Sequence, residues 1–196
     1  MRMQIDRRSA MPRNETEESL SALLNRLVSE CDRALGSLPK RAHDAEWPSA
    51  CERGAPDAQD DIAWLPAKRA VCGSFEGVEA ALEVELHPDI KAYYGSFWSD
   101  SFGVRANEGD VTLIQIWNDA DFDRLCENIV GHALAKRHAK IPLTVFIACT
   151  DEGEFMLSVD NETGEVVLEN PGEAPVRVIE ASLPKFLQRL QPVVTR

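Results

Sequence analysis

Residues 111–138, VTLIQIWNDADFDRLCENIVGHALAKRH, join the pattern of a buried strand to that of a long helix. Residues 111–117 lie between Gly109 and Asn118 and are apolar on both faces, which predicts a strand inside a sheet. Asn118 is a residue type that caps helices. Acidic residues follow it at the start of the helix and basic residues lie at its end, as the helix macrodipole favours. Apolar positions at helical spacing predict the buried face of this helix: Phe122, Leu125, Cys126, Ile129, Val130, Ala133 and Leu134.

Three further strand patterns follow this helix. They cover residues 143–149, 154–160 and 165–169, and the Asp-Glu-Gly and Asn-Glu-Thr-Gly turns between them are short enough for hairpins. The three strands are therefore expected to form an antiparallel meander. Residues 176–179 are a further strand candidate, and Ser182 opens a closing helix.

The amino-terminal part of the chain is predicted to be mostly helical. Asn14 begins a capping pattern, and leucines at helical spacing follow it. Residues 78–86 also have mostly helical spacing, and Pro88 suits the first turn of the next helix. Residues 36–61 show neither a strand period nor a helix period, so we expect a variable loop that Trp64 anchors.

The order of these elements predicts an α+β fold with a mixed, mainly antiparallel β-sheet packed with helices. The chain has 196 residues, 44% of them hydrophobic, which is enough for one sizeable core. We expect residues 1–13 to be a disordered leader and residues 14–196 to form a single domain.

The charge of the chain favours a basic partner. The net charge of -12 disfavours nucleic acid, whose phosphates need clusters of Lys and Arg. Residues 71–127 hold three basic and twelve acidic residues, a local balance of -9. The chain lacks an apolar run long enough to cross a membrane, an apolar signal-peptide core at its start and a CxxC pattern among its five cysteines. We therefore expect a cytosolic protein in a reducing compartment.

The sequence carries no pattern typical of an enzyme. It contains no GxGxxG, P-loop, GxSxG or HExxH motif. His132 stands alone among apolar residues, which favours a core or capping role. His132 and His138 would lie about 9 Å apart along a helix, which is wrong for a shared zinc ion. We expect no catalytic residue, no cofactor and no metal.

Three consecutive blocks of the sequence resemble one known family. They are LIQIWNDADF at residues 113–122, ENIVGH at residues 127–132 and LTVFIA at residues 143–148. In these blocks the chain is similar to the Syd family of SecY-interacting proteins. The likeness extends more loosely over about the last three-fifths of the chain, although Cys126 and Leu143 stand where Gln and Pro are expected in many members.

This resemblance implies a fold of the SUKH type with a concave, acidic groove. It also implies the partner, the cytoplasmic loops of SecY, which the positive-inside rule makes rich in Lys and Arg. The protein is then expected in the cytoplasm and at the cytoplasmic face of the inner membrane. Its attachment there would be peripheral and through the channel, because anionic head groups repel an acidic surface.

Ten side chains from the acidic part of the chain are candidates for this partner-binding surface. The alternative role of Asp119 and Asp121 is helix capping, and that of Glu83 and Glu85 is an ordinary solvated helix face. The aromatic residues of the same region are expected in the core, except that Trp98 and Phe102 are expected at the groove rim. The candidates are Glu83, Glu85, Asp89, Trp98, Asp100, Glu108, Asp110, Asp119, Asp121 and Asp123.

A second function of a different class stays open, because the SUKH fold is also used by immunity proteins that neutralise toxins. An immunity protein would be encoded beside a toxin gene and bind that toxin tightly. A Syd-like protein would bind channel loops in a salt-sensitive way. Fold alone does not distinguish the two.

Overall fold

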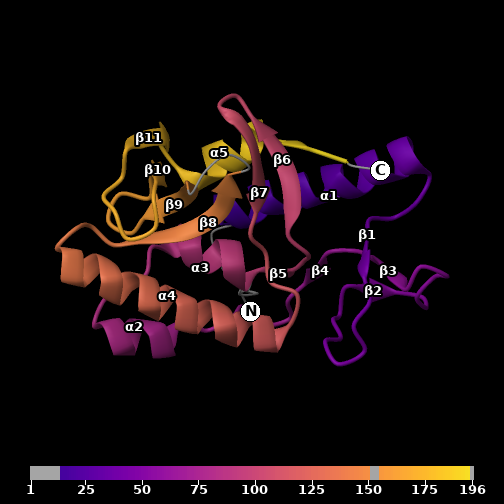
Figure 1. Cartoon of the computed structure of the whole chain (residues 1–196), viewed down its shortest axis with the longest axis horizontal. Helices are drawn as coiled ribbons and strands as arrows, with labels where there is room; N and C mark the ends of the chain where they lie inside the picture. Colours follow the sequence, from indigo (N-terminus) through magenta and orange to yellow (C-terminus); the bar gives the residue numbers. More distant parts are fainter. Residues whose placement is uncertain (1–13, 151–154, 195–196) are drawn as a thin grey trace, which may run out of the picture.

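The structure is a computed structural model that describes residues 14–150 and 155–194. The leader expected at residues 1–13 lies outside these residues. The described residues form a seven-stranded sheet with helices packed around it, which confirms the predicted α+β class (Figure 1). A smaller three-stranded sheet lies beside the large one.

The large sheet has the strand order β11-β10-β9-β8-β7-β6-β12, and all of its neighbouring strands are antiparallel. The predicted meander is confirmed, because consecutive strands from β7 to β11 are neighbours. The predicted strand after Gly109 is also confirmed inside the sheet, between β6 and β8. The strands are β7 (Gly109–Leu113), β8 (Thr144–Thr150), β9 (Met156–Asp160), β10 (Val166–Glu169) and β11 (Arg177–Glu180).

Two strands of this sheet are absent from the predicted pattern. β6 (Phe102–Ala106) forms a hairpin with β7, and β12 (Gln191–Pro192) pairs with β6 from the far end of the chain. Glycine and charged residues in and around β6 hide its period, and β12 is too short to have one. Phe102 was expected at a groove rim, but it is 6% exposed because it points into the core from β6.

The predicted strand over residues 111–117 is shorter than expected. β7 ends at Leu113, although Ile114 N still donates a hydrogen bond to Ile147 O at 2.8 Å. Beyond this point the chain leaves β8, and the Tyr94 hydroxyl donates to the carbonyl of Phe146 at 2.7 Å. A side chain from a helix thus satisfies a sheet carbonyl where the neighbouring strand has diverged.

The five predicted helices are present in the described residues. Figure 1 shows α2 and α4 together along one side of the molecule, and α1 packs against α3 and α5. α2 stops at Leu82, four residues before the end of its predicted span, because Glu83 adopts a left-handed conformation with φ of 54°. The helices are α1 (Glu15–Leu35), α2 (Glu76–Leu82), α3 (Pro88–Gly95), α4 (Asp119–Ala139) and α5 (Leu183–Arg189).

Helix α4 follows the predicted pattern at its start and departs from it at its end. The Asn118 side chain accepts a hydrogen bond from the backbone N–H of Asp121 at 3.0 Å, which confirms the predicted cap. Leu134 was expected on the buried face, but it is 49% exposed. The next buried residue after Ala133 is instead Lys136, and this spacing of three residues continues the buried stripe of the helix.

The loop expected at residues 36–61 contains two short strands. β1 (Lys40–Ala42) and β2 (Glu52–Arg53) both pair with β3 (Asp61–Trp64). These strands are too short and too polar for a detectable period. Trp64 is 2% exposed and meets Trp117 edge to face, with ring centroids 6.2 Å apart. It therefore anchors this segment against the junction that leads into α4, as predicted.

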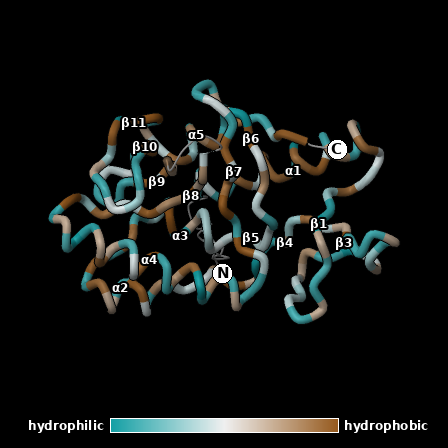
Figure 2. The backbone as a smooth tube through the Cα atoms, viewed as in Figure 1, coloured by the Kyte–Doolittle hydropathy of each residue, from teal (hydrophilic) through white to brown (hydrophobic). Residues whose placement is uncertain are grey.

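The interior confirms that most aromatic residues of the acidic region are core residues. Tyr93 and Tyr94 are fully buried, and Phe97 and Trp117 are nearly so. Hydrophobic residues follow the strands of the large sheet and the inner faces of the helices (Figure 2). Trp98, in β5 (Phe97–Trp98), is half-buried and pairs through its strand with β4 (Ala67–Lys68).

Candidate protein-binding surface

The two candidate acids of the β6–β7 hairpin are bound by arginines of the same chain. Arg105 donates to both carboxylate oxygens of Asp110 at 2.8 Å, and Arg189 donates to both oxygens of Glu108 at 2.9 Å. The hydrogen bonds from Arg105 lower the pKa of Asp110. Burial opposes ionisation of Glu108, but the hydrogen bonds from Arg189 leave its pKa lowered. These two charges are thus largely compensated before any partner binds.

These hairpin acids border a cleft with a volume of about 510 Å³. Its walls are mostly apolar and include Leu157, Leu168 and Ile179 from β9, β10 and β11. Arg177 also lines it. Because Arg177 lines this cleft and arginines already bind its two acids, the cleft lacks the net negative charge that a basic partner requires.

Asp100 is also compensated within the chain. Its Oδ1 lies 3.0 Å from Nη1 of Arg41, and both side chains are mostly buried. Burial raises the pKa of Asp100, and the positive charge of Arg41 opposes that shift. Nearby, the guanidinium of Arg69 lies 3.7 Å from the centre of the Trp98 ring and so covers one face of this candidate aromatic residue.

Asp89 and Asp121 have structural partners. The Thr16 hydroxyl donates to Asp89 Oδ1 at 2.6 Å and so links α1 to the start of α3. Asp121 Oδ2 accepts a hydrogen bond from the backbone N–H of Trp117 at 3.1 Å. For Asp121 the alternative role in capping is thus visible in its contacts.

The remaining candidate acids project from the side of the molecule that α2 and α4 form. Glu83 at the end of α2 and Asp123 on α4 are exposed, and within the described residues neither has an ion pair. The Asp119 side chain is 92% exposed and lies 4.0 Å from Arg69. Glu85 is exposed as well, 3.4 Å from Lys91.

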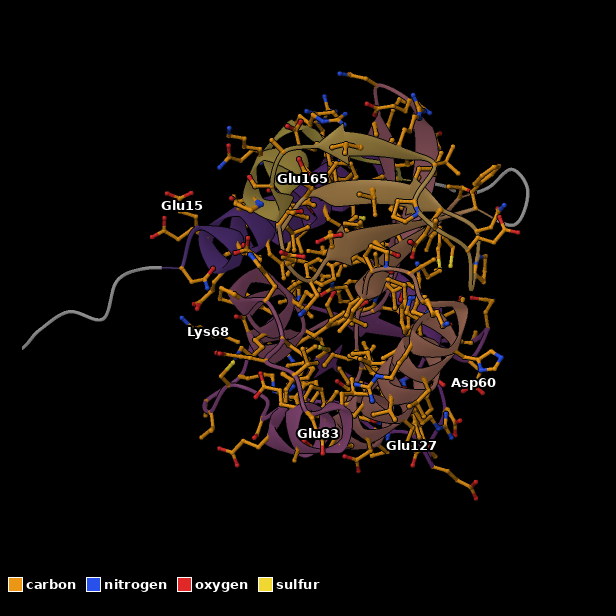
Figure 3. All side chains as sticks on the ribbon, turned by 90° about the vertical axis from the view of Figure 1, so that its left-hand side faces the viewer. Glu15, Asp60, Lys68, Glu83, Glu127 and Glu165 are labelled. Carbon is orange, nitrogen blue, oxygen red and sulfur yellow. The ribbon has the colours of Figure 1, made fainter. Side chains whose placement is uncertain are left out.

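Glu127 belongs to this surface but was not among the predicted residues. It is exposed, it has no ion pair in the part of the chain that the structure describes, and it lies one helical turn after Asp123 on α4. Figure 3 places Glu127 and Glu83 at the same end of the molecule. The spacing of four residues was the sequence signal that could have identified Glu127. We call Glu83, Asp119, Asp123 and Glu127 the acidic helix face.

An apolar groove runs between the two helices of this face. It has a volume of about 480 Å³. Its lining residues are Ser74, Gly77, Val78, Phe122, Asp123, Cys126, Glu127 and Val130. Two acids of the acidic helix face thus border an apolar floor. The ten predicted side chains do not converge on one concavity. They divide among this face, the β6–β7 hairpin and the segment around Trp98, while Glu85 and Asp89 have partners on α3 and α1, and Asp121 caps the start of α4.

His132 and Lys136 join a buried polar network and lie apart from this surface. His132 Nε2 lies 3.1 Å from the Thr144 hydroxyl, and Lys136 Nζ donates to Glu169 Oε2 at 2.6 Å. Burial lowers the pKa of His132. The described residues contain no group of three or more His, Cys, Asp or Glu side chains that could hold a metal ion. Across the same residues, no helix is both long and apolar enough to cross a bilayer.

Comparisons with known proteins give one consistent result. The family model described as Syd protein (SUKH-2) matches residues 17–192. Protein Syd of Pseudoalteromonas atlantica is 42% identical over 155 residues, 78% of this chain and 83% of the relative. Protein Syd of Alteromonas mediterranea is 39% identical over 176 residues, 89% and 97% of the two chains. Protein Syd of Shewanella sp. strain MR-7 is 44% identical over 160 residues, 81% and 74% of the two chains.

Proposed function

The chain belongs to the Syd family, and we propose that it is a binding protein, not an enzyme, which holds basic cytoplasmic loops of SecY on its acidic helix face. The observation that carries this proposal is the distribution of uncompensated charge. Arginines of the chain bind Asp100, Glu108 and Asp110. In contrast, Glu83, Asp123 and Glu127 have no ion pair among the described residues and face solvent on neighbouring helices.

The acidic helix face suits the expected chemistry of the partner. Cytoplasmic loops of a membrane channel are enriched in Lys and Arg. An exposed ion pair contributes only about 0.2 to 1 kcal/mol, so several carboxylates must act together. Complementary charge of this kind raises the association rate and orients the encounter, and both effects weaken with salt. The protein would then reach the membrane through the channel, at its cytoplasmic side.

The experiment that tests this proposal is binding to purified SecY complex in nanodiscs at low and high salt. The test variant carries Glu83→Gln, Asp123→Asn and Glu127→Gln. A matched control carries Glu15→Gln, Asp60→Asn and Glu165→Gln, which changes the net charge equally at sites apart from Glu83 and Glu127 (Figure 3). Circular dichroism verifies that both variants are folded.

We expect the test variant to bind roughly 3- to 100-fold more weakly than the wild type at low salt, because it loses three exposed ion pairs of about 0.2 to 1 kcal/mol each. The control should bind within about threefold of the wild type. Equal losses in both variants would show that only the net charge matters and would contradict the assignment to α2 and α4. No binding of the wild type at any salt would refute the SecY proposal and favour the immunity-protein alternative.

A further inference from the structure

The groove between α2 and α4 offers a partner an apolar surface, which the acids alone do not provide. Its floor is built from Val78 on α2 and from Phe122, Cys126 and Val130 on α4. Burial, and then the neighbouring Asp123 carboxylate, raise the pKa of Cys126, so its thiol stays protonated and uncharged. The floor is therefore apolar throughout, and at about 480 Å³ the groove lies within the range of about 300 to 1,000 Å³ typical of ligand sites.

Gly77 lines the groove on the α2 side. A Cβ atom built on Gly77 would meet no heavy atom within 4 Å. Gly77 is the second residue of α2, and its backbone is helical. The space beside Gly77 is therefore open to a larger side chain.

Carboxylates border this apolar floor on the α4 side. Asp123 and Glu127 line the groove there, and the exposed Glu76 lies in the first turn of α2, which contains no basic residue. Three cations lie nearby and are already engaged: the guanidinium of Arg69 lies 4.7 Å from the centre of the Phe122 ring. Arg124 lies 4.2 Å from the centre of the Trp47 ring, and Lys91 binds Glu79 at 2.9 Å. The border of the groove thus matches Lys or Arg side chains on either side of an apolar one.

We propose that the α2–α4 groove binds a basic protein segment by taking up one large apolar side chain of that segment, while Asp123 and Glu127 hold its flanking Lys or Arg residues. The inference rests on the proposed function and adds to it a requirement for an apolar anchor. Among the described residues the groove has no converging set of polar groups for a small ligand, because Ser74 and the two carboxylates are the polar side chains of this lining apart from the Cys126 thiol. A segment anchored by an apolar side chain in a groove between helices is an established mode of peptide recognition.

The variant Gly77→Leu tests this inference because it fills the groove without changing any charge. Its backbone is helical, so leucine is compatible there and should not lower the melting temperature. Gly131→Leu is the matched control. Gly131 is also a helical glycine with no heavy atom within 4 Å of its Cβ position, but it does not line the groove.

Two probes separate this inference from the proposed function. The first is SecY complex in nanodiscs. The second is a pair of synthetic peptides, Lys-Lys-Arg-Phe-Lys-Arg-Lys and the same peptide with Ser in place of Phe, measured by fluorescence anisotropy. We expect the Phe peptide to bind the wild type about 10- to 100-fold more tightly than the Ser peptide, as for one buried aromatic side chain. Gly77→Leu should abolish that preference and weaken SecY binding, whereas Gly131→Leu should change neither.

Each result decides one of the two ideas. Wild-type binding to SecY that Gly77→Leu leaves intact, with no preference for the Phe peptide, would overturn the groove inference and leave the acidic helix face in place. A Phe preference that Gly77→Leu removes, without SecY binding by the wild type, would support the groove and refute SecY as its partner. If Gly77→Leu does not fold, Val130→Ser replaces it, because it removes apolar floor from the half-buried Val130 site. A Phe preference unchanged in Val130→Ser would then overturn the inference.

Discussion

Lys136→Met should remove a large part of the stability of the fold, because it leaves a buried carboxylate without its cation. Lys136 and Glu169 are both fully buried, and their charged groups are 2.6 Å apart. Lys136 Nζ also donates to the carbonyl of Glu173 at 2.7 Å. Met keeps most of the apolar stem and removes the ammonium group, so the change isolates the loss of charge and of donors.

The expected cost follows from these contacts. Removing one partner of a buried ion pair destabilises a protein by about 3 to 5 kcal/mol, because the other charge stays buried and unpaired. The Thr144 hydroxyl, which donates to the second Glu169 oxygen at 2.7 Å, compensates only part of that charge. A domain has about 5 to 15 kcal/mol of total stability, so the loss is a third or more of the free energy of unfolding at typical values.

Urea denaturation at pH 7.5 measures this change through the midpoint and slope of the transition. Lys185→Met is the control, because Lys185 is an exposed lysine on α5 and should change stability by less than about 0.5 kcal/mol. Lys136→Met combined with Glu169→Gln should regain at least half of the loss, because the unpaired charge is gone. A loss below about 1 kcal/mol in Lys136→Met would refute the reasoning that the pair is shielded from water.

Three further predictions concern stability and use the same urea assay. Burial lowers the pKa of His132, so the unfolded chain takes up this proton at a higher pH than the folded one; stability should fall as the pH drops from 7.5 to 5.5, and His132→Gln should reduce that fall. Asn118→Ala should cost about 1 kcal/mol through the lost cap, and more through the lost hydrogen bond to Pro48 O, whereas a change below about 0.3 kcal/mol would contradict the capping role. Tyr94→Phe should cost about 1 to 3 kcal/mol because the Phe146 carbonyl loses its donor, and an unchanged midpoint would mean that water replaces the hydroxyl.

Local patterns in the sequence determine most of the fold. The Asn14 and Asn118 caps, the meander and the closing helix all depend on signals within a few residues, and all are present in the structure. The missed elements depend on partners far along the chain. β12 is recognisable only through its pairing with β6, and Lys136 is buried because Glu169 meets it from β10. An amphipathic pattern assigns a lysine to the surface and cannot anticipate that partner.

The candidate surface was harder to predict for the same reason. A count of charges along residues 71–127 does not include the cations that the fold brings close from other parts of the chain. Glu108 is paired with Arg189, and Asp100 with Arg41, in each case across more than fifty residues. Glu127, in contrast, needed only its spacing from Asp123 on one helix. Acids on helix surfaces could therefore be predicted from the sequence, whereas the availability of acids near the strands could not.

The position of the acidic helix face follows from where the cations of the chain are used. Arginines from the small sheet, from β6 and from α5 reach Asp100, Asp110 and Glu108 in and beside the strands. α2 contains no basic residue. On α4, Arg124 lies against Trp47, Lys136 binds Glu169 and Arg137 donates to the carbonyl of Leu82, and within the described residues none of them forms an ion pair with Asp123 or Glu127. Among the predicted acids, those without an ion pair in the described residues thus lie on α2 and α4, the helices that also border an apolar groove. A partner that neutralises this charge would relieve the repulsion among the acids. Binding of that partner would therefore also stabilise α2 and α4.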